Sequence, residues 1–210
     1  MERHTEFMFG VPWIMEFFHQ DWKLDASTPA EAVADEFVEE LEPAAVLSVR
    51  RDARLLLDNL TSAQIKALWK GGADATESFF QRHVGEGDEW MRQVIGVCDA
   101  WLSRRADTPA LSDADRYGGV ELAGDVLAEV HEFRSVLDTE VTDALAECAR
   151  SCTPDLALRL LLRALPKKSA SLSPEYLYLS EEQYARLEAL GNAFHYGEYV
   201  VSDIKYLVDT

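Results

Sequence analysis

The spacing of apolar residues follows the period of an α-helix through nearly the whole chain, and this pattern restricts the fold more than any other feature. Residues 43–59, for example, carry apolar side chains three or four positions apart: Val46, Val49, Ala53, Leu56 and Leu57. Such spacing places these side chains on one buried helix face. No sustained alternation of apolar and polar residues predicts a strand, and residues 171–179 are extended at most. We therefore expect an all-α protein of packed helices with little or no sheet.

Capping signals divide the helical pattern into segments. Thr28, Thr61 and Ser180 each precede a helical run and carry Glu or Gln three residues later, which is the pattern of a capping box. Proline at a first-turn position favours helix starts at residues 12, 29, 43 and 154. The expected helices are 12–18, 29–41, 43–59, 62–71, 77–83, 88–104, 119–137, one that begins at 139, 155–165, 181–191 and 199–208, with a polar connection at 166–171.

The aromatic residues are unevenly distributed along the 210-residue chain. All five tryptophans precede residue 102, and all seven tyrosines follow residue 116. Between these groups, residues 104–113 form a polar segment that contains a proline, as domain connections often do. We therefore predict two helical domains with separate cores, at residues 1–105 and 112–210.

The chain is strongly acidic, with a formal net charge of -18, and both predicted halves share the excess of acid. Because 48% of its residues are hydrophobic, the charge belongs to a folded surface and not to a disordered tail. An acidic surface repels nucleic acid and accelerates encounter with a basic partner. We expect no direct nucleic-acid binding, and a basic protein such as a nuclease domain as partner.

Cysteine usage and hydropathy bear on location. Three cysteines form no disulfide framework in a chain of this size, so we interpret them as reduced thiols. Residues 1–6 show no basic region leading into an apolar run, and no segment approaches the roughly 20 apolar residues of a membrane span. We expect a cytoplasmic protein without membrane contact.

The most distinctive motif occupies residues 17–22. It consists of Phe17, Phe18, His19, Gln20, Asp21 and Trp22, and it is followed by Thr28, Pro29 and an acidic helical run over residues 30–42. With these features, residues 17–105 resemble the immunity proteins of contact-dependent growth inhibition and related polymorphic-toxin systems. The resemblance implies a binding protein, not an enzyme, that neutralises a cognate toxin domain in the producing cell by masking its active or substrate-binding surface. We expect a monomer when the toxin is absent.

The resemblance also implies that shared motif residues form the scaffold, because partners in such systems diversify at their contacts. We therefore expect Phe18 and Trp22 to pack in the core, with His19 beside them in a structural role. Gln20 or Asp21 would bind backbone amides where the chain turns toward the Thr28 cap. A direct contact between Trp22 and the toxin stays open as an alternative.

Two acidic stripes are the candidate toxin-binding surfaces. The stripe in the predicted helix 119–137 consists of Glu121, Asp125, Glu129 and Glu132, spaced so that they share one face. The stripe in the predicted helix 29–41 consists of Glu31, Asp35, Glu36, Glu39 and Glu40, with Glu42 just beyond it. Like charges four residues apart destabilise an isolated helix. Each stripe is therefore either a solvated face or a docking surface for lysine and arginine.

Enzymatic and metal-binding alternatives have weaker support. A metal-dependent hydrolase would use His19, Asp21 and His131, and a metal cluster would combine Cys148 and Cys152 with His131. Side chains two residues apart on a helix point to different sides, and no phosphate-binding or nucleophile motif is present. We predict no catalytic residues, metal or cofactor. A helical adaptor that assembles several proteins remains an alternative function.

Overall fold

The computed structural model describes residues 3, 6–19, 21–73, 79–107, 110–170 and 178–208, and residue 170 by its backbone alone. Among these residues the regular structure is helical, with one isolated parallel bridge between Leu179 and Val208, so the predicted all-α class is confirmed. The first half contains α1 (Val11–Ile14), a 3-10 turn η1 (Met15–Phe17), α2 (Trp22–Asp25), α3 (Pro29–Glu36), α4 (Pro43–Asn59), α5 (Ser62–Gly72), a π-helical turn η2 (Phe80–Val84) and α7 (Gly87–Leu102). The second half contains α8 (Asp113–Arg116), η3 (Val120–Leu122), α9 (Ala123–Glu132), η4 (Phe133–Ser135), α10 (Thr139–Glu147), a π-helical turn η5 (Cys148–Cys152), α11 (Pro154–Ala170), α12 (Glu181–Ala193), α13 (Glu198–Ser202) and η6 (Lys205–Leu207).

The predicted helix starts are largely confirmed, because capping is a local interaction. Thr61 and Ser180 each form a complete capping box with the glutamine three residues later. The Thr28 hydroxyl accepts a hydrogen bond from the Glu31 amide at 3.1 Å. The Glu31 carboxylate in turn accepts one from the Ser27 amide at 2.8 Å. Glu31, a carboxylate of the first acidic stripe, therefore stabilises the start of α3.

The predicted helix 29–41 ends five residues early, at Glu36. Phe37 leaves the helical conformation, with φ -83° and ψ 68°, and its side chain is buried. The indole of Trp101 donates to the Phe37 carbonyl at 2.8 Å, and Arg105 donates to the Glu39 carbonyl. Bonds from α7 and the chain just beyond it therefore replace the helical bonds that residues 37–41 would make. Glu39 and Glu40 lie in a turn and not on a helical stripe.

Other helix ends also differ from the prediction. The predicted helix 119–137 is a short α-helix between two 3-10 turns, and the last helix is only five residues long before η6. α11 continues through Pro166 to Ala170 instead of ending at residue 165. Because Leu161, Leu162 and Leu165 are all buried, packing of the preceding turns outweighs the penalty of an interior proline. Of the predicted helix 77–83, residues 77 and 78 lie outside the described residues, and residues 80–83 belong to the π-helical turn η2.

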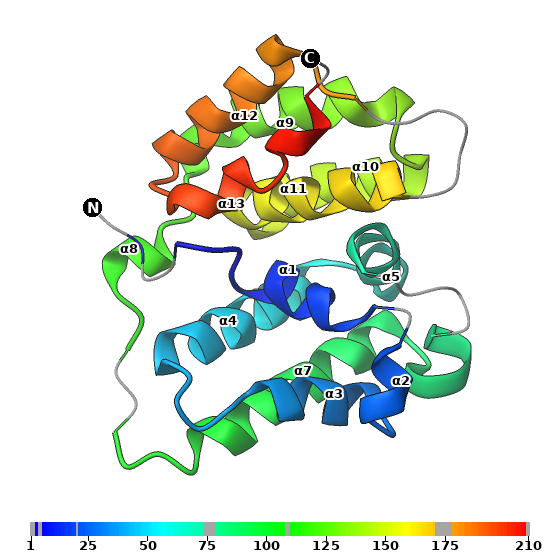
Figure 1. The fold of residues 1–210 in the computed structure, drawn as a ribbon, viewed down its shortest axis with the longest axis vertical. Helices are drawn as coiled ribbons and strands as arrows, with labels where there is room; N and C mark the ends of the chain where they lie inside the picture. Colours follow the sequence, from blue (N-terminus) through cyan, green and yellow to red (C-terminus); the bar gives the residue numbers. More distant parts are fainter. Residues whose placement is uncertain are drawn as a thin grey trace.

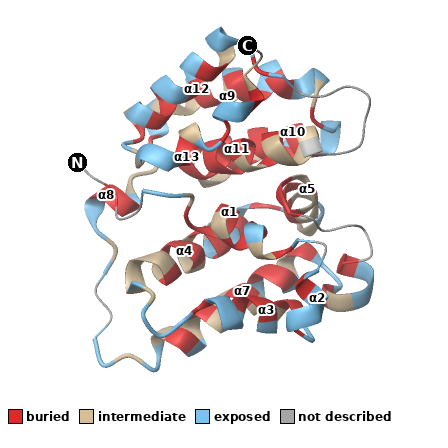
Figure 2. Ribbon diagram, in the orientation of Figure 1, coloured by how far each residue is buried: buried red, intermediate tan, exposed pale blue. Residues whose placement is uncertain are grey.

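The two halves of the chain occupy opposite ends of the molecule but share one core (Figure 1). α4 packs along α7 within the first half, while α5 packs against both α10 and α11 of the second. Buried faces from both halves point toward this junction (Figure 2). Their apolar side chains belong to one continuous cluster, so the prediction of separate cores is wrong. The division at residues 105–112 stays a prediction.

Four charged side chains are buried where the halves meet, and we call Arg3, Asp52, Asp155 and Arg159 the buried charge cluster. Arg159 of α11 donates to Asp52 of α4 at 2.7 Å and to Asp155 at 2.8 Å. Arg3 lies 2.9 Å from the second oxygen of Asp155. The four side chains are at most 1% exposed. Pairing of this kind is what makes buried charges tolerable, and it ties the two halves together.

The N-terminal strap, residues 6–10, runs between the halves (Figure 1) and touches the buried charge cluster. The Phe9 carbonyl accepts a hydrogen bond from Arg159 at 2.8 Å, and the Arg159 guanidinium lies 4.1 Å from the centre of the Phe9 ring. Gly10 has φ 69°, and a Cβ at this position would lie 1.8 Å from a carboxylate oxygen of Asp52. Only glycine therefore allows this close approach of the strap.

Candidate binding site

The predicted acidic stripe spans η3 and α9, and two of its four carboxylates are paired with a cation within the fold. Glu129 is only 6% exposed, and Arg186 of α12 donates to its two oxygens at 2.6 and 3.4 Å. Glu132 lies 3.5 Å from the same guanidinium and accepts a bond from Gln183 at 3.2 Å. Glu121 accepts a bond from the Tyr117 hydroxyl, which lowers the pKa of Glu121. Of the four predicted contact residues, Glu129 is therefore corrected to a buried structural residue, and Asp125 remains exposed.

The first acidic stripe is arranged differently. Asp35 and Glu36 are exposed on α3, and Glu39, Glu40 and Glu42 are exposed in the connection to α4. Within the described part of the chain, no ion pair involves Glu39, Glu40 or Glu42. These carboxylates are therefore available to a partner. Glu40 and Glu42 also line a pocket beside the N-terminal strap.

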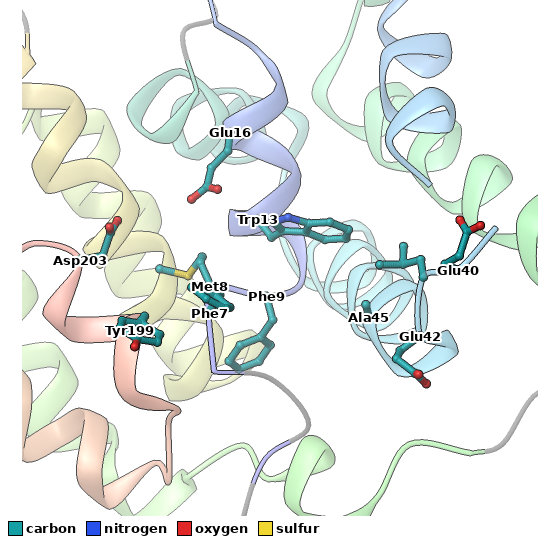
Figure 3. Close-up of a pocket in the computed structure, with 11 residues that line it drawn as sticks. Phe7, Met8, Phe9, Trp13, Glu16, Glu40, Glu42, Ala45, Tyr199 and Asp203 are labelled. Carbon is teal, nitrogen blue, oxygen red and sulfur yellow. The ribbon is translucent and has the colours of Figure 1, made fainter. Parts of the chain in front are cut away.

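This pocket, of about 640 Å³, lies where the strap meets both halves of the chain. We call it the acidic aromatic pocket, after the side chains that line it. Its aromatic lining residues are Phe7, Phe9, Trp13 and Tyr199. Its charged lining residues are all acidic: Glu16, Glu40, Glu42 and Asp203. Glu16 and Asp203 lie on one side of the aromatic residues, and Glu40 and Glu42 lie on the other (Figure 3).

Backbone and ring contacts fix the aromatic wall of the pocket. The Tyr199 amide at the start of α13 donates to the Glu6 carbonyl at 2.9 Å. This bond aligns the strap with α13, so that the rings of Phe7 and Tyr199 stack with centroids 4.9 Å apart. The Trp13 ring stacks on the nearly parallel ring of Phe37, with the two ring centroids 5.9 Å apart. These contacts therefore hold the aromatic wall in place without a partner.

Glu16 and Asp203, two acidic side chains of the pocket, repel each other. The pKa of Glu16 is raised, first because partial burial disfavours its charged form and further because Asp203 is close. Arg163 of α11 opposes this effect and approaches Glu16 to 3.4 Å. This guanidinium lies behind the pocket and not on its lining. An added cation would relieve the remaining repulsion.

Of the motif at residues 17–22, Phe18 and Trp22 are confirmed as core residues, whereas His19 and Asp21 are exposed. Phe18 is 1% exposed and packs edge-to-face against Trp22, Trp69 and Trp90. Trp22 itself is 6% exposed, so its alternative placement as a contact residue is corrected to a core position. His19 accepts a hydrogen bond from the Asp21 amide at 3.2 Å, the turn-stabilising role that we had expected of Asp21 or Gln20. Gln20 lies outside the described residues.

The residues of the alternative hydrolase do not come together. His19 and Asp21 lie just before α2 in one half, and His131 is exposed on α9 in the other (Figure 1). No group of three potential metal ligands occurs within the described ranges. Cys148 is buried, and its bond with Cys152 together with burial raises its pKa well above the usual range. Cys152 donates to the Leu55 carbonyl at 3.3 Å, so this cysteine pair acts as packing.

Several pocket residues were not among the predicted contacts. Phe7, Trp13 and Glu16 come from the N-terminal region, whereas Tyr199 and Asp203 come from the other end of the chain. The only local signal was an aromatic residue with polar neighbours, a pattern that core residues share.

No helix in the described part of the chain has both the length and the hydrophobicity of a membrane span. Comparisons with protein-family models, with curated proteins and with solved structures find no match.

Proposed function

We propose that this chain is an immunity protein, which binds a cognate basic toxin domain in the cytoplasm and masks its active or substrate-binding surface. The observation that carries the proposal is the acidic aromatic pocket, because every charged side chain on its lining is a carboxylate. Steering by opposite charge gives fast encounter, and buried aromatic contacts give most of the affinity in protein complexes. The pocket offers both on one surface.

The sequence supports the same proposal from a different direction. Residues 17–105 resemble immunity proteins of polymorphic-toxin systems, and Phe18 and Trp22 of the motif that carries this resemblance pack in the core. The net charge of -18 favours a cationic partner such as a nuclease domain. In this proposal the motif shapes the scaffold, while the connection after α3 and the strap meet the toxin.

The test is a titration against the toxin domain encoded beside this chain. Stoichiometric addition of the purified protein should abolish toxin activity, and surface plasmon resonance should show association that slows as salt rises. As a control, an inactive toxin variant should bind with the same salt dependence. A protein that leaves toxin activity unchanged at molar excess would refute the proposal.

A further inference from the structure

An exposed aromatic pair lies beside two carboxylates in the acidic aromatic pocket. Phe7 is 61% exposed and Tyr199 is 42% exposed, although the two rings stack at an angle of only 16°. Exposed apolar surface of this kind often marks a place where a ligand binds. Asp203 lies one helical turn beyond Tyr199, and Glu16 faces the same side of the pocket (Figure 3).

The charges around this pair are unbalanced. Among the described residues, the ion pair formed by a lining carboxylate is that of Glu16 with Arg163, through a 3.4 Å contact. A ligand that fits must therefore carry positive charge on the side that faces Glu16 and Asp203. It must also be flat to cover the stacked rings.

A guanidinium group has both properties, since it is planar, stacks on aromatic rings and bonds to carboxylates in the same plane. The buried charge cluster already uses this combination. Arg159 lies 4.1 Å from the Phe9 ring centre while it bonds to Asp52, and Arg3 lies 5.3 Å from the same ring centre while it pairs with Asp155 at 2.9 Å. A lysine ammonium is a point charge and would leave the flat surface uncovered.

Resting on the proposed function, we propose that the acidic aromatic pocket receives an arginine side chain of the toxin, stacked on the exposed outer surface of the Phe7–Tyr199 pair and bonded to Glu16 and Asp203. A volume of about 640 Å³ exceeds what one side chain fills, so residues flanking the arginine enter as well. Glu40 and Glu42 then face the neighbouring residues of the same basic segment.

The test uses the whole protein and a small probe, N-acetyl-arginine amide, followed by NMR. The amide signals of Phe7 and Tyr199 and the indole signal of Trp13 should shift and saturate with the probe. N-acetyl-citrulline amide has the same shape without the charge, and it should bind at least about tenfold more weakly. Equal shifts with both probes, or no shift at these residues, would overturn the inference.

Variants then locate the contact. Glu16→Gln and Asp203→Asn should each weaken arginine binding by roughly two- to fivefold, and Tyr199→Leu by a similar factor. Asp125→Asn removes an exposed charge on α9 and is the matched control, with no change expected. Since the comparison of arginine with citrulline uses unaltered protein, a variant that fails to fold does not decide the question.

The toxin separates this inference from the proposed function. If the double variant Glu16→Gln and Asp203→Asn binds the toxin as tightly as the unaltered protein does, the arginine site is wrong and the immunity function stands. If the arginine probe saturates the pocket but no toxin binds, the pocket chemistry is supported and the immunity function fails.

Discussion

The acidic stripe on α9 and the acidic segment after α3 are both rich in carboxylates but have opposite roles in the fold. On α9, Glu129 and Glu132 share the guanidinium of Arg186. After α3, Glu40 and Glu42 line an open pocket, and no ion pair involves either of them in the described part of the chain. A carboxylate is therefore most available for binding where the fold supplies no close cation for it.

Packing decides which carboxylates find a cation. α9 lies against α12, which places Arg186 beside Glu129 across 57 positions of sequence. The segment after α3 faces Trp101 and Arg105, but both of these side chains bond to its backbone carbonyls and leave its carboxylates to solvent. The buried charge cluster is the extreme case of internal pairing. The following changes test this difference between paired and available charges.

The largest effect is expected for Arg159→Leu in the buried charge cluster. The variant leaves Asp52 and Asp155 buried without their main cation, and breaking such a pair costs about 3–5 kcal/mol of unfolding free energy. Urea denaturation at neutral pH measures this loss. The matched control is Arg134→Leu, which breaks an exposed pair with Asp143 and should cost less than about 1 kcal/mol.

The same variant has a pH signature. Burial alone would raise the pKa of Asp155, but Arg159 and Arg3 outweigh burial and lower it. In the unaltered protein, this group therefore adds stability above its unfolded pKa, which is lost as pH falls through its lowered folded pKa. Without Arg159 burial dominates, so the destabilisation should be greatest at neutral pH and shrink toward pH about 4. A loss that does not change with pH would argue against a charged Asp155.

A smaller stability change is expected when α9 loses its partner. Arg186→Leu leaves the carboxylate of Glu129 nearly buried and without a cation, which should cost about 1–3 kcal/mol. By contrast, the double variant Glu40→Gln and Glu42→Gln should stay within about 0.5 kcal/mol of the unaltered protein. Equal losses in the two variants would mean that both acidic regions are structural.

Local chemistry made much of the fold predictable. Thr28, Thr61, Ser180 and Pro43 begin helices at the expected residues because a cap needs only neighbours within three or four positions. The end of α3 was mispredicted because the groups that bond residues 37–39 belong to α7 and the residues after it. The shared core was missed for a similar reason, as the packing of α5 on α10 and α11 leaves no local pattern.

The candidate site was only partly predictable. The acidic segment around Glu39 and Glu40 follows from composition, and both residues are exposed as expected. The aromatic wall does not, because Phe7 meets Tyr199 from the far end of the chain and each residue resembles an ordinary core aromatic in sequence. Glu129 is the opposite case, a predicted contact residue that the fold pairs internally. The spacing of acidic residues along a helix does not show that Arg186 bonds to it.

A moderate kinetic effect is expected from the available carboxylates. The double variant Glu40→Gln and Glu42→Gln should slow association with the basic toxin about threefold at low salt, because these charges steer the encounter. At high salt the difference should disappear. Glu121→Gln in η3 with Asp125→Asn in α9 is the matched control, and stopped-flow fluorescence should show a smaller change. Equal slowing in both double variants would assign steering to net charge alone.

The smallest effect concerns Glu16, which sits between the two kinds of carboxylate because Arg163 pairs with it only loosely. Its pKa is raised by partial burial and by Asp203, so its contribution to stability is full at low pH and is lost as pH rises through the raised value. Glu16→Gln stays neutral at every pH. The variant should therefore gain a few tenths of a kcal/mol relative to the unaltered protein between pH about 4 and pH about 7. Urea midpoints at the two pH values measure this gain, and a relative loss at neutral pH would show that the bond to Arg163 dominates and that Glu16 belongs with the internally paired acids.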